Sequence, residues 1–185
     1  MQLCPSDCLK VIASTLEQLE RKPLIGSVKP GGIVTAANAS GINDGAAAMV
    51  VMSSEKAKEH GVTPMGRVAA SASEGVNPAI MGMEPVYSTR RALKKAGLDL
   101  SQIDLIEANE AFAVQSIAVA CELGWDMAKV NVNGGAIALR QSIGASGARI
   151  LVTLLHELKN ANARYGLATL CVGGGMGITT IVERI

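Results

Sequence analysis

The 185-residue sequence has few aromatic side chains, no dominant sign of charge and no long apolar run. It contains one Phe, one Trp and two Tyr, too few for the stacking platforms of single-strand nucleic-acid binders. Seventeen Lys and Arg residues face 16 Asp and Glu, a net charge of +1, so the basic field that draws proteins to nucleic acid is missing. We therefore expect no nucleic-acid partner. We also expect no membrane association, because Gly, Asn and charged residues interrupt every hydrophobic stretch.

The four cysteines lack the paired spacing of zinc motifs, and the first ten residues lack the basic and then apolar pattern of a secretory signal. We expect no metal site and a reduced, cytoplasmic protein. Hydrophobic residues make up 49% of the chain and charged ones 18%, which is typical of a compact globular protein. Because glycines are frequent and aromatics rare, the core is expected to consist of small and aliphatic side chains at close backbone approach.

From Met65 onward, strand-like and helix-like segments alternate. This alternation favours an α/β layered fold with a mixed, mostly parallel sheet flanked by helices, in which the last two strands pair antiparallel around a Gly-rich turn. Helices are expected near 86–96, 112–123 and 143–159, and strands near 66–73, 103–107, 130–133, 167–172 and 178–184.

The segment before residue 64 has a different character. It predicts a helix within 3–24, a short β-prone stretch at 33–37, a buried strand at 46–52, and a short helix that Ser53 or Ser54 caps and that reaches His60. The buried strand has too few neighbours of its own, and a lone hydrophobic strand requires another sheet to accept it. We interpret this segment as the tail of a further structural unit.

Three loops rich in Gly and Asn fall at the ends of expected strands, where open α/β sheets place ligands. They span 107–112, 131–147 and 171–177. Such loops expose backbone N–H groups that can hold a developing oxyanion, and a cysteine beside them can serve as a nucleophile or proton carrier. Cys171 opens the third loop. The alternative is that the glycines mark tight turns and that Cys171 is a small buried hydrophobe.

Four segments together resemble the C-terminal half of a thiolase of the acetyl-CoA acetyltransferase type. They read NASGINDGAA at 38–47, NEAF at 109–112, NGGAIAL at 133–139 and CVGGGMG at 171–177. The resemblance implies a layered thiolase-like fold, with residues 1–62 as the tail of the N-terminal domain and 63–185 as the C-terminal domain. It also implies acyl transfer between acyl-CoA and CoA or acetyl-CoA, with coenzyme A as a substrate and no separate cofactor.

The resemblance assigns roles to individual residues. Cys171 matches the cysteine that abstracts or returns the α-proton as a thiolate, so we expect its loop to lower the thiol pKa. Gly173 would supply a backbone N–H to one oxyanion hole, and Asn109 would hold a water for the other. The positions that resemble the CoA and acyl channel are Ser40, Ala111, Phe112 and Met81. The structural alternatives are a helix-capping role for Asn109 and core positions for Phe112 and Met81.

The chain departs from the family pattern at Arg140-Gln141-Ser142, where the family has Gly-His-Pro. Gln141 therefore stands at the position of the family's catalytic histidine, but an amide cannot accept and return a proton near neutral pH. Arg140 stands where the backbone favours glycine, and Ser142 removes a conformational lock. We interpret His60 and His156, the only histidines, as surface or helix-packing residues that do not substitute.

No residue of the chain matches the family's nucleophilic cysteine. We therefore expect little or no turnover from this chain alone, since groups that act as a unit lose most of their effect when one is removed. We expect it to require an N-terminal thiolase half or a homo-oligomer. The alternative is a non-catalytic module that binds acyl-CoA or pairs with a thiolase; a decayed product without function is a third interpretation.

Overall fold

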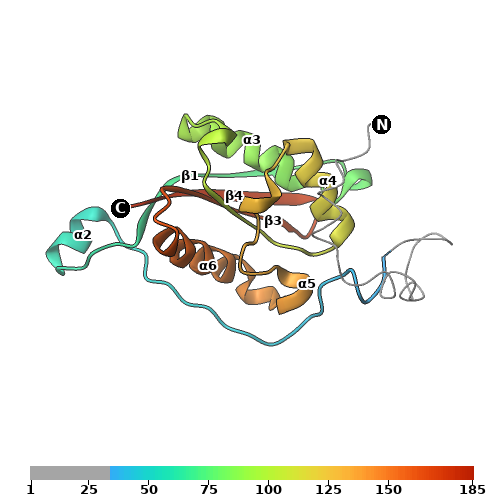
Figure 1. The fold of residues 1–185 in the computed structure, drawn as a ribbon, viewed down its shortest axis with the longest axis horizontal. Helices are drawn as coiled ribbons and strands as arrows, with labels where there is room; N and C mark the ends of the chain where they lie inside the picture. The colour runs from blue at the N-terminus through green and yellow to red at the C-terminus, as the bar shows by residue number, and fades with distance from the viewer. Residues whose placement is uncertain (1–33) are drawn as a thin grey trace.

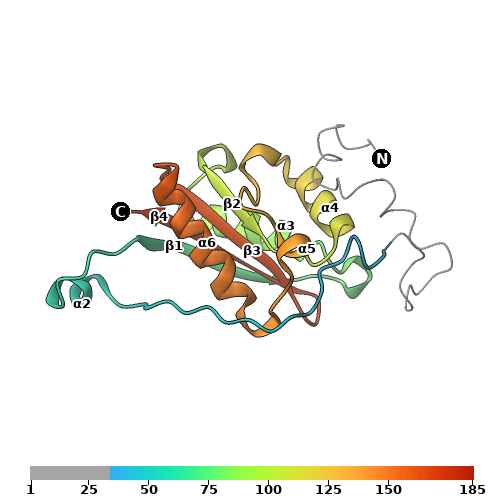
Figure 2. The ribbon, with the colours of Figure 1, turned by 60° about the horizontal axis from the view of Figure 1, so that its bottom comes forward.

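The computed structural model describes residues 34–185, in which a four-stranded sheet lies between helical layers (Figure 1). The strands are β1 (Gly66–Gly75), β2 (Leu105–Ala108), β3 (Tyr165–Val172) and β4 (Met176–Arg184), in the order β1-β4-β3-β2. Helices α3 (Glu84–Ala96) and α4 (Ala113–Leu123) cover one face, and α6 (Ser146–Asn160) covers the other, as Figure 2 shows from a second direction. The predicted layered α/β fold is confirmed.

The sheet is mixed, as expected, but parallel pairing is the minority. Among the described strands, β1 with β4 and β3 with β4 are antiparallel, and only β2 with β3 is parallel. The strand predicted at 130–133 is wrong: Val130 makes a single parallel bridge to Ile106, and no strand forms. The 3-10 helix η4 (Met127–Lys129) precedes it, and Asn131 with φ of 47° turns the chain away, so the parallel part of the sheet does not grow.

Two apolar cores lie on opposite faces of the sheet. Leu167 and Ile181, both fully buried, join the core beneath α3 and α4. Their neighbours Ala168 and Val182 join the core beneath α6. This alternation follows from the period of two along a strand, and it assigns every second residue of β3, including Cys171, to the α3 and α4 face.

The helix ends follow local sequence signals. α3 ends at Gly97 and α4 at Gly124, each with φ of 67°, the left-handed conformation that glycine adopts at low cost. The predicted short helix is confirmed as α2 (Ser54–Glu59), where the Ser53 hydroxyl accepts the N–H of Lys56 at 3.3 Å. The short elements are η2 (Pro78–Ile80), η3 (Leu100–Gln102), α5 (Ala136–Leu139) and η5 (Ile143–Ala145).

The segment from residue 34 to α2 runs along the outside of the α6 layer (Figure 1). The strand predicted at 46–52 does not form: the chain is extended, and Val50 and Val51 are 84% and 78% exposed. No sheet edge in the described part of the chain receives it. Residues 34–37 hold a turn rather than the β-prone stretch expected at 33–37, and the helix expected within 3–24 lies outside the described residues.

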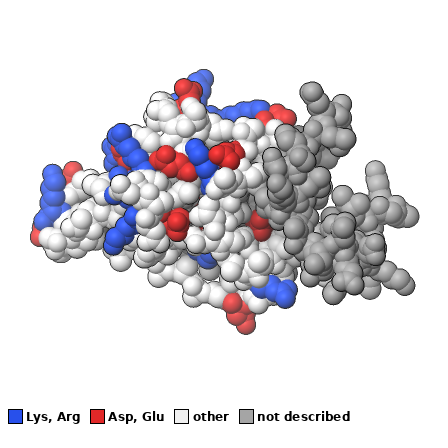
Figure 3. Space-filling model, in the orientation of Figure 1, with Lys and Arg blue, Asp and Glu red and all other residues white. Residues whose placement is uncertain are grey.

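Within residues 34–185, no helix is long and apolar enough to cross a bilayer. On the face shown in Figure 3, basic and acidic side chains are interspersed, and no large area of that face carries one sign of charge.

Glu183, near the end of β4, forms ion pairs whose contribution to stability can be tested. Hydrogen bonds from Arg67 and then Arg164 lower its pKa from 4.5 to about 2. A depressed carboxyl pKa stabilises the fold above 4.5, and this stabilisation is lost as the pH falls toward about 2. We expect Glu183→Gln to remove this acid sensitivity when urea unfolding near neutral pH is compared with unfolding at about pH 3.

Glu59→Gln is the matched control, because Glu59 is exposed and pairs with Lys56 inside α2. It should retain the full loss of stability in acid. Equal acid sensitivity of the parent chain and Glu183→Gln would contradict the assignment.

Candidate functional site

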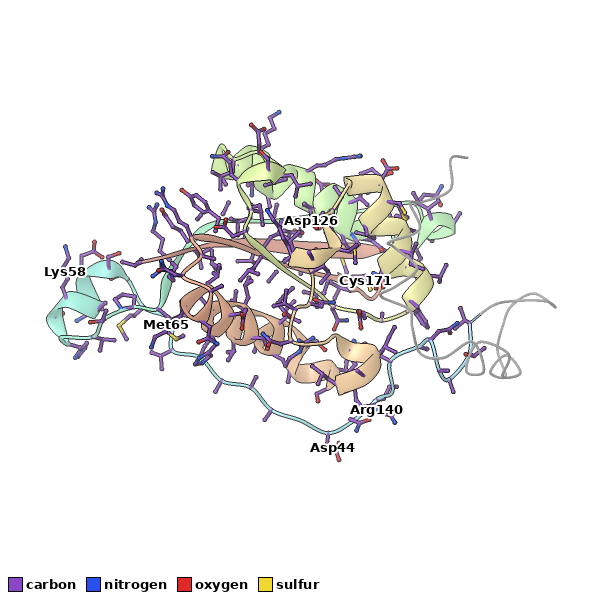
Figure 4. The ribbon with its side chains drawn as sticks, viewed as in Figure 1. Asp44, Lys58, Met65, Asp126, Arg140 and Cys171 are labelled. Carbon is purple, nitrogen blue, oxygen red and sulfur yellow. The ribbon has the colours of Figure 1, made fainter. Side chains whose placement is uncertain are left out.

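Cys171 lies on β3 close to its end, directly opposite Gly177 of β4 (Figure 4). Its side chain is half-buried. Gly177 permits α3 to approach, because a Cβ at this position would lie 2.6 Å from the Cβ of Glu84. The start of α3 therefore packs on the strand pair immediately beside Cys171.

Glu84 is a fully buried carboxylate at this contact. Its Oε2 accepts the backbone N–H of Gly82 at 2.6 Å, whereas its Oε1 has no partner among the described residues. Glu84 was not among the site residues predicted from the sequence. The sequence signal was a glutamate directly before Pro85 at the start of a helix. Burial of this side chain, however, depends on the absence of a Cβ at Gly177.

The pKa of the Cys171 thiol is raised, first by burial and then by the charge of Glu84, while a hydrogen bond from the Gln115 side chain opposes the rise. The prediction of a lowered pKa is therefore wrong for this chain. The charge that acts on the thiol, that of buried Glu84, is negative, and both burial and a negative charge disfavour a thiolate.

Asn109 follows β2 and is held against β3, where its N–H donates to the carbonyl of Thr169 at 2.9 Å. Its side chain is buried, and both Nδ2 and Oδ1 lack a partner within residues 34–185. It does not cap a helix, because α4 begins after Phe112 without a side-chain cap. The parallel pairing of β2 with β3 thus brings Asn109 and Cys171 to the same end of the sheet.

A second group forms around Ser40. Its N–H and its hydroxyl both donate to the carbonyl of Ala111, at 3.0 and 3.3 Å, and the hydroxyl also contacts Gln141 Oε1 at 2.9 Å. Phe112 pairs with Ala39 in an isolated bridge and is 41% exposed. The fold therefore brings together Ser40, Ala111, Phe112 and Gln141, which are far apart in sequence.

The triplet Arg140-Gln141-Ser142 contacts the extended segment that precedes α2. Gln141 donates its N–H to Gly41 and accepts that of Asn43, at 2.8 and 3.0 Å. Arg140 covers Gly41, where a Cβ would lie 2.5 Å from its Nη1. Arg140 has φ of 76° and ψ of 162°, a region that glycine almost alone occupies, so the expectation that this backbone favours glycine is confirmed.

The remaining predicted residues are all exposed. Gly173 is exposed in the turn between β3 and β4. Met81 follows η2 and is 70% exposed, so neither Met81 nor Phe112 occupies a core position. His60 at the end of α2 and His156 on α6 are both exposed, as expected.

Two buried glutamates that were not predicted from the sequence support the loops. Glu110 accepts the N–H of Ile137 at 3.3 Å and fits against Gly135, which has no side chain to collide with the carboxylate. Glu107 lies 3.1 Å from Arg149 of α6. Burial raises the pKa of Glu107 to about 7 despite this arginine. The sequence signal for both was a glutamate at or just after the end of the apolar strand β2.

The groups described so far involve no cluster of metal ligands. Within the described residues, no three His, Cys, Asp or Glu side chains converge.

Comparison with known proteins identifies matches along most of the chain. The sequence profile described as thiolase, C-terminal domain, matches residues 62–184, and that described as thiolase, N-terminal domain, matches residues 9–55. The acetyl-CoA acetyltransferase of Syntrophomonas wolfei is 62% identical over 88% of this chain and 41% of its own length. That of Escherichia coli is 59% identical over 87% of this chain and 42% of its own length. The chain thus spans about two fifths of these relatives.

Solved structures agree with this result. The acetyl-CoA acetyltransferase of Bacillus anthracis superimposes with a TM-score of 0.87 at 47% identity, over 91% of this chain and 42% of its own. Human mitochondrial 3-ketoacyl-CoA thiolase in complex with CoA gives a TM-score of 0.83 at 42% identity, over 94% of this chain and 43% of its own. The predicted thiolase-like layers are thereby confirmed.

Glu84→Gln tests the electrostatics around Cys171. The variant removes the charge but retains an oxygen that accepts the Gly82 N–H. We expect the pKa of Cys171 to fall, because the charge of Glu84 raises it. The measurement is the pH dependence of iodoacetamide alkylation, followed by mass spectrometry of the Cys171 peptide, and its midpoint should move to lower pH. Glu122→Gln, at an exposed carboxylate, should leave the midpoint in place. An unchanged midpoint in Glu84→Gln would exclude the carboxylate as a cause.

Arg140→Gly tests backbone strain at the triplet. We expect the free energy of unfolding to rise by about 1 kcal/mol, because relief of an unfavourable φ and ψ exceeds the added entropy of the unfolded chain. Urea unfolding measures the difference. Arg140→Ala removes the same guanidinium but retains a Cβ, and should give no such gain. Equal stabilisation by both variants would assign the effect to the guanidinium instead.

Proposed function

We propose, from the premise that this chain belongs to the thiolase family, that it supplies the second-half residues of an acetyl-CoA acetyltransferase site. Residues 1–62 would be the tail of the N-terminal domain and 63–185 the C-terminal domain. The observation that carries the proposal is the placement of Cys171 beside the buried, unpaired amide of Asn109 at one end of the sheet. This pairs a proton-carrying thiol with a donor suited to an oxyanion.

In the proposed reaction, Cys171 is the acid and base for the α-carbon of an acetyl thioester. The C–H bond breaks and the proton passes to the sulfur. The carbanion then forms a C–C bond to an acyl group, whose thiolate leaves. In the cleaving direction, Cys171 returns the proton. A raised thiol pKa favours the protonated form, so this chain by itself is suited to return a proton rather than to abstract one.

The Asn109 Nδ2 and the N–H of Gly173 would stabilise oxyanions, the first through a water molecule. Asn109 is suited to this role because its amide is buried without a protein partner. Gly173 is suited because its backbone lies exposed in the turn after β3. Neither role requires a proton to be exchanged, because each acts through hydrogen-bond donation alone.

Acyl-CoA and CoA are the proposed ligands, with Ser40, Ala111, Phe112 and Met81 along the channel. Three of these four lie together, and both Phe112 and Met81 expose apolar surface. One of the similar structures is a thiolase in complex with CoA. The Ser40 hydroxyl is engaged by Gln141, so a ligand amide must compete with this contact.

The chain alone is proposed to be inactive or very weak. Gln141 uses its side chain and backbone to hold the extended segment, and an amide supplies no proton transfer. A partner is therefore required, either an N-terminal thiolase half or another copy. The exposed segment at 46–52, with Val50 and Val51 in solvent, supports this requirement and also favours the second candidate, a non-catalytic module that pairs with a thiolase.

The test is thiolysis of acetoacetyl-CoA by the purified chain, alone and co-expressed with the first half of the Syntrophomonas wolfei relative. We expect no turnover alone. The triple change Arg140→Gly, Gln141→His and Ser142→Pro, with that half present, should raise turnover by at least about 100-fold. Adding Cys171→Ser to the triple variant should abolish this gain.

Turnover by the unmodified chain alone would contradict the proposed inactivity. A triple variant that assembles with the first half but stays inactive would contradict the catalytic assignment. In that case, calorimetric binding of CoA by the unmodified chain would favour the non-catalytic module, and absence of binding together with a monomeric sedimentation profile would contradict that candidate too.

A further inference from the structure

A small cavity lies between the sheet, the start of α3 and α4, and Asn109 of the candidate site lines it. Its volume is about 10 Å³, which is about the least space that holds one water molecule. Apolar groups of Pro85, Ala108 and Val119 form part of its wall. The polar part comes from Ser116 and Thr169, whose hydroxyls donate to main-chain carbonyls, and from Asn109, Gln115 and Trp125. The cavity is therefore both water-sized and chemically mixed.

Three of these polar residues share an unusual property. Asn109, Gln115 and Trp125 are 4%, 8% and 7% exposed, yet each has a buried polar atom without a partner in the described part of the chain. The atoms are Nδ2 and Oδ1 of Asn109, Oε1 of Gln115 and Nε1 of Trp125. Buried polar groups are almost always hydrogen-bonded, and three exceptions around one cavity point to a shared ligand.

The chemistry of these atoms identifies the ligand. The indole N–H is a donor only, and the two amide oxygens are acceptors only. A group that satisfies all three must accept one hydrogen bond and donate two, which a single water molecule does. An anion cannot donate to the amide oxygens, and a metal ion cannot accept from the indole.

We propose that this cavity binds one ordered water, which accepts from Trp125 Nε1 and donates to Gln115 Oε1 and Asn109 Oδ1. In this arrangement the amide oxygens of Gln115 and Asn109 both face the cavity. The nitrogen of each amide is then left for the candidate site. The water thus sets the orientation of two amides at once.

The orientation matters for Gln115, which is a positioning residue. Its side chain lowers the pKa of the Cys171 thiol and so opposes the rise caused by burial. The stem of Gln115 is confined, because a Cβ on Gly82 would lie 3.2 Å from its Cγ. With Oε1 on the water, Nε2 faces the sulfur and stabilises the thiolate. This consequence rests on the proposed role of Cys171, whereas the water site itself does not.

Two measurements on the full chain test the proposal. The first is a crystal structure at a resolution that shows ordered solvent, where we expect one density peak within hydrogen-bond distance of Trp125 Nε1, Gln115 Oε1 and Asn109 Oδ1. The second is the alkylation rate of Cys171 by iodoacetamide at about pH 8, read from the mass of its peptide. Neither measurement depends on acyl transfer, so a failure of the proposed function leaves both intact.

Val119→Ile fills the cavity with a methyl group, and Trp125→Phe removes the donor. We expect each to slow alkylation by about threefold or more, because loss of one hydrogen bond to the thiolate is worth at least that factor. Val114→Ile, on the same helix at a position 44% exposed, is the matched control and should alkylate at the parent rate. Circular dichroism verifies folding, and if Val119→Ile does not fold, Trp125→Phe carries the test.

Absence of the density peak would overturn the water site. A peak together with parent-rate alkylation in both variants would overturn the positioning role of the water. Slowing of the control Val114→Ile to the same extent would also overturn it, because that residue does not line the cavity.

Discussion

Close approach of α3 to the β3 and β4 pair is the contact on which the other features depend. It is possible because Gly177 has no Cβ at the point where the backbone of Glu84 crosses β4. An alanine here would lie within 3 Å of main-chain atoms of Glu84, and main chain cannot yield as a flexible side chain can. Cys171 lies directly across the hairpin from this glycine, so the same approach determines how deeply its thiol is buried.

The contact between α3 and the sheet also buries four hydroxyl side chains that hydrogen-bond to one another. The hydroxyl of Thr179 bonds to those of Ser88 and Thr169, each at 2.8 Å, and to that of Thr89 at 3.1 Å. All four residues are fully buried between α3 and the sheet. Satisfied networks of this kind specify one packing arrangement, because any shift leaves buried groups unpaired. Thr169 lies two residues before Cys171 on the same face of β3. Closer to Cys171, Glu84 Oε1 and Gln115 Oε1 have no hydrogen-bond partner among the described residues.

A second constraint joins the two parts of the chain. The Ser40 hydroxyl donates to Gln141 Oε1, and the Gln141 main chain hydrogen-bonds to Gly41 and Asn43. These bonds hold residues 40–43 beside the end of α5. The strained Arg140 is maintained because its neighbours on both sides are fixed, by α5 before it and by Gln141 after it. Arg140 and Gln141 therefore serve in packing against the extended segment.

Much of this protein could be predicted from its sequence. Alternating periodicity located α3, α4, α6, β3 and β4, because the spacing of apolar residues is a local property of the chain. The motifs indicated the family and the candidate residues for the same reason, since each motif is a contiguous stretch of sequence.

Tertiary structure decided the rest. The failure of 46–52 and 130–133 to form strands depends on partners that no local pattern encodes. The direction of the Cys171 pKa depends on burial and on Glu84, 87 positions earlier in the chain. Electrostatic energy depends on distance in space and on exclusion of solvent. For this reason the sequence determined which groups are present, and only the fold determined which of them meet and in what environment.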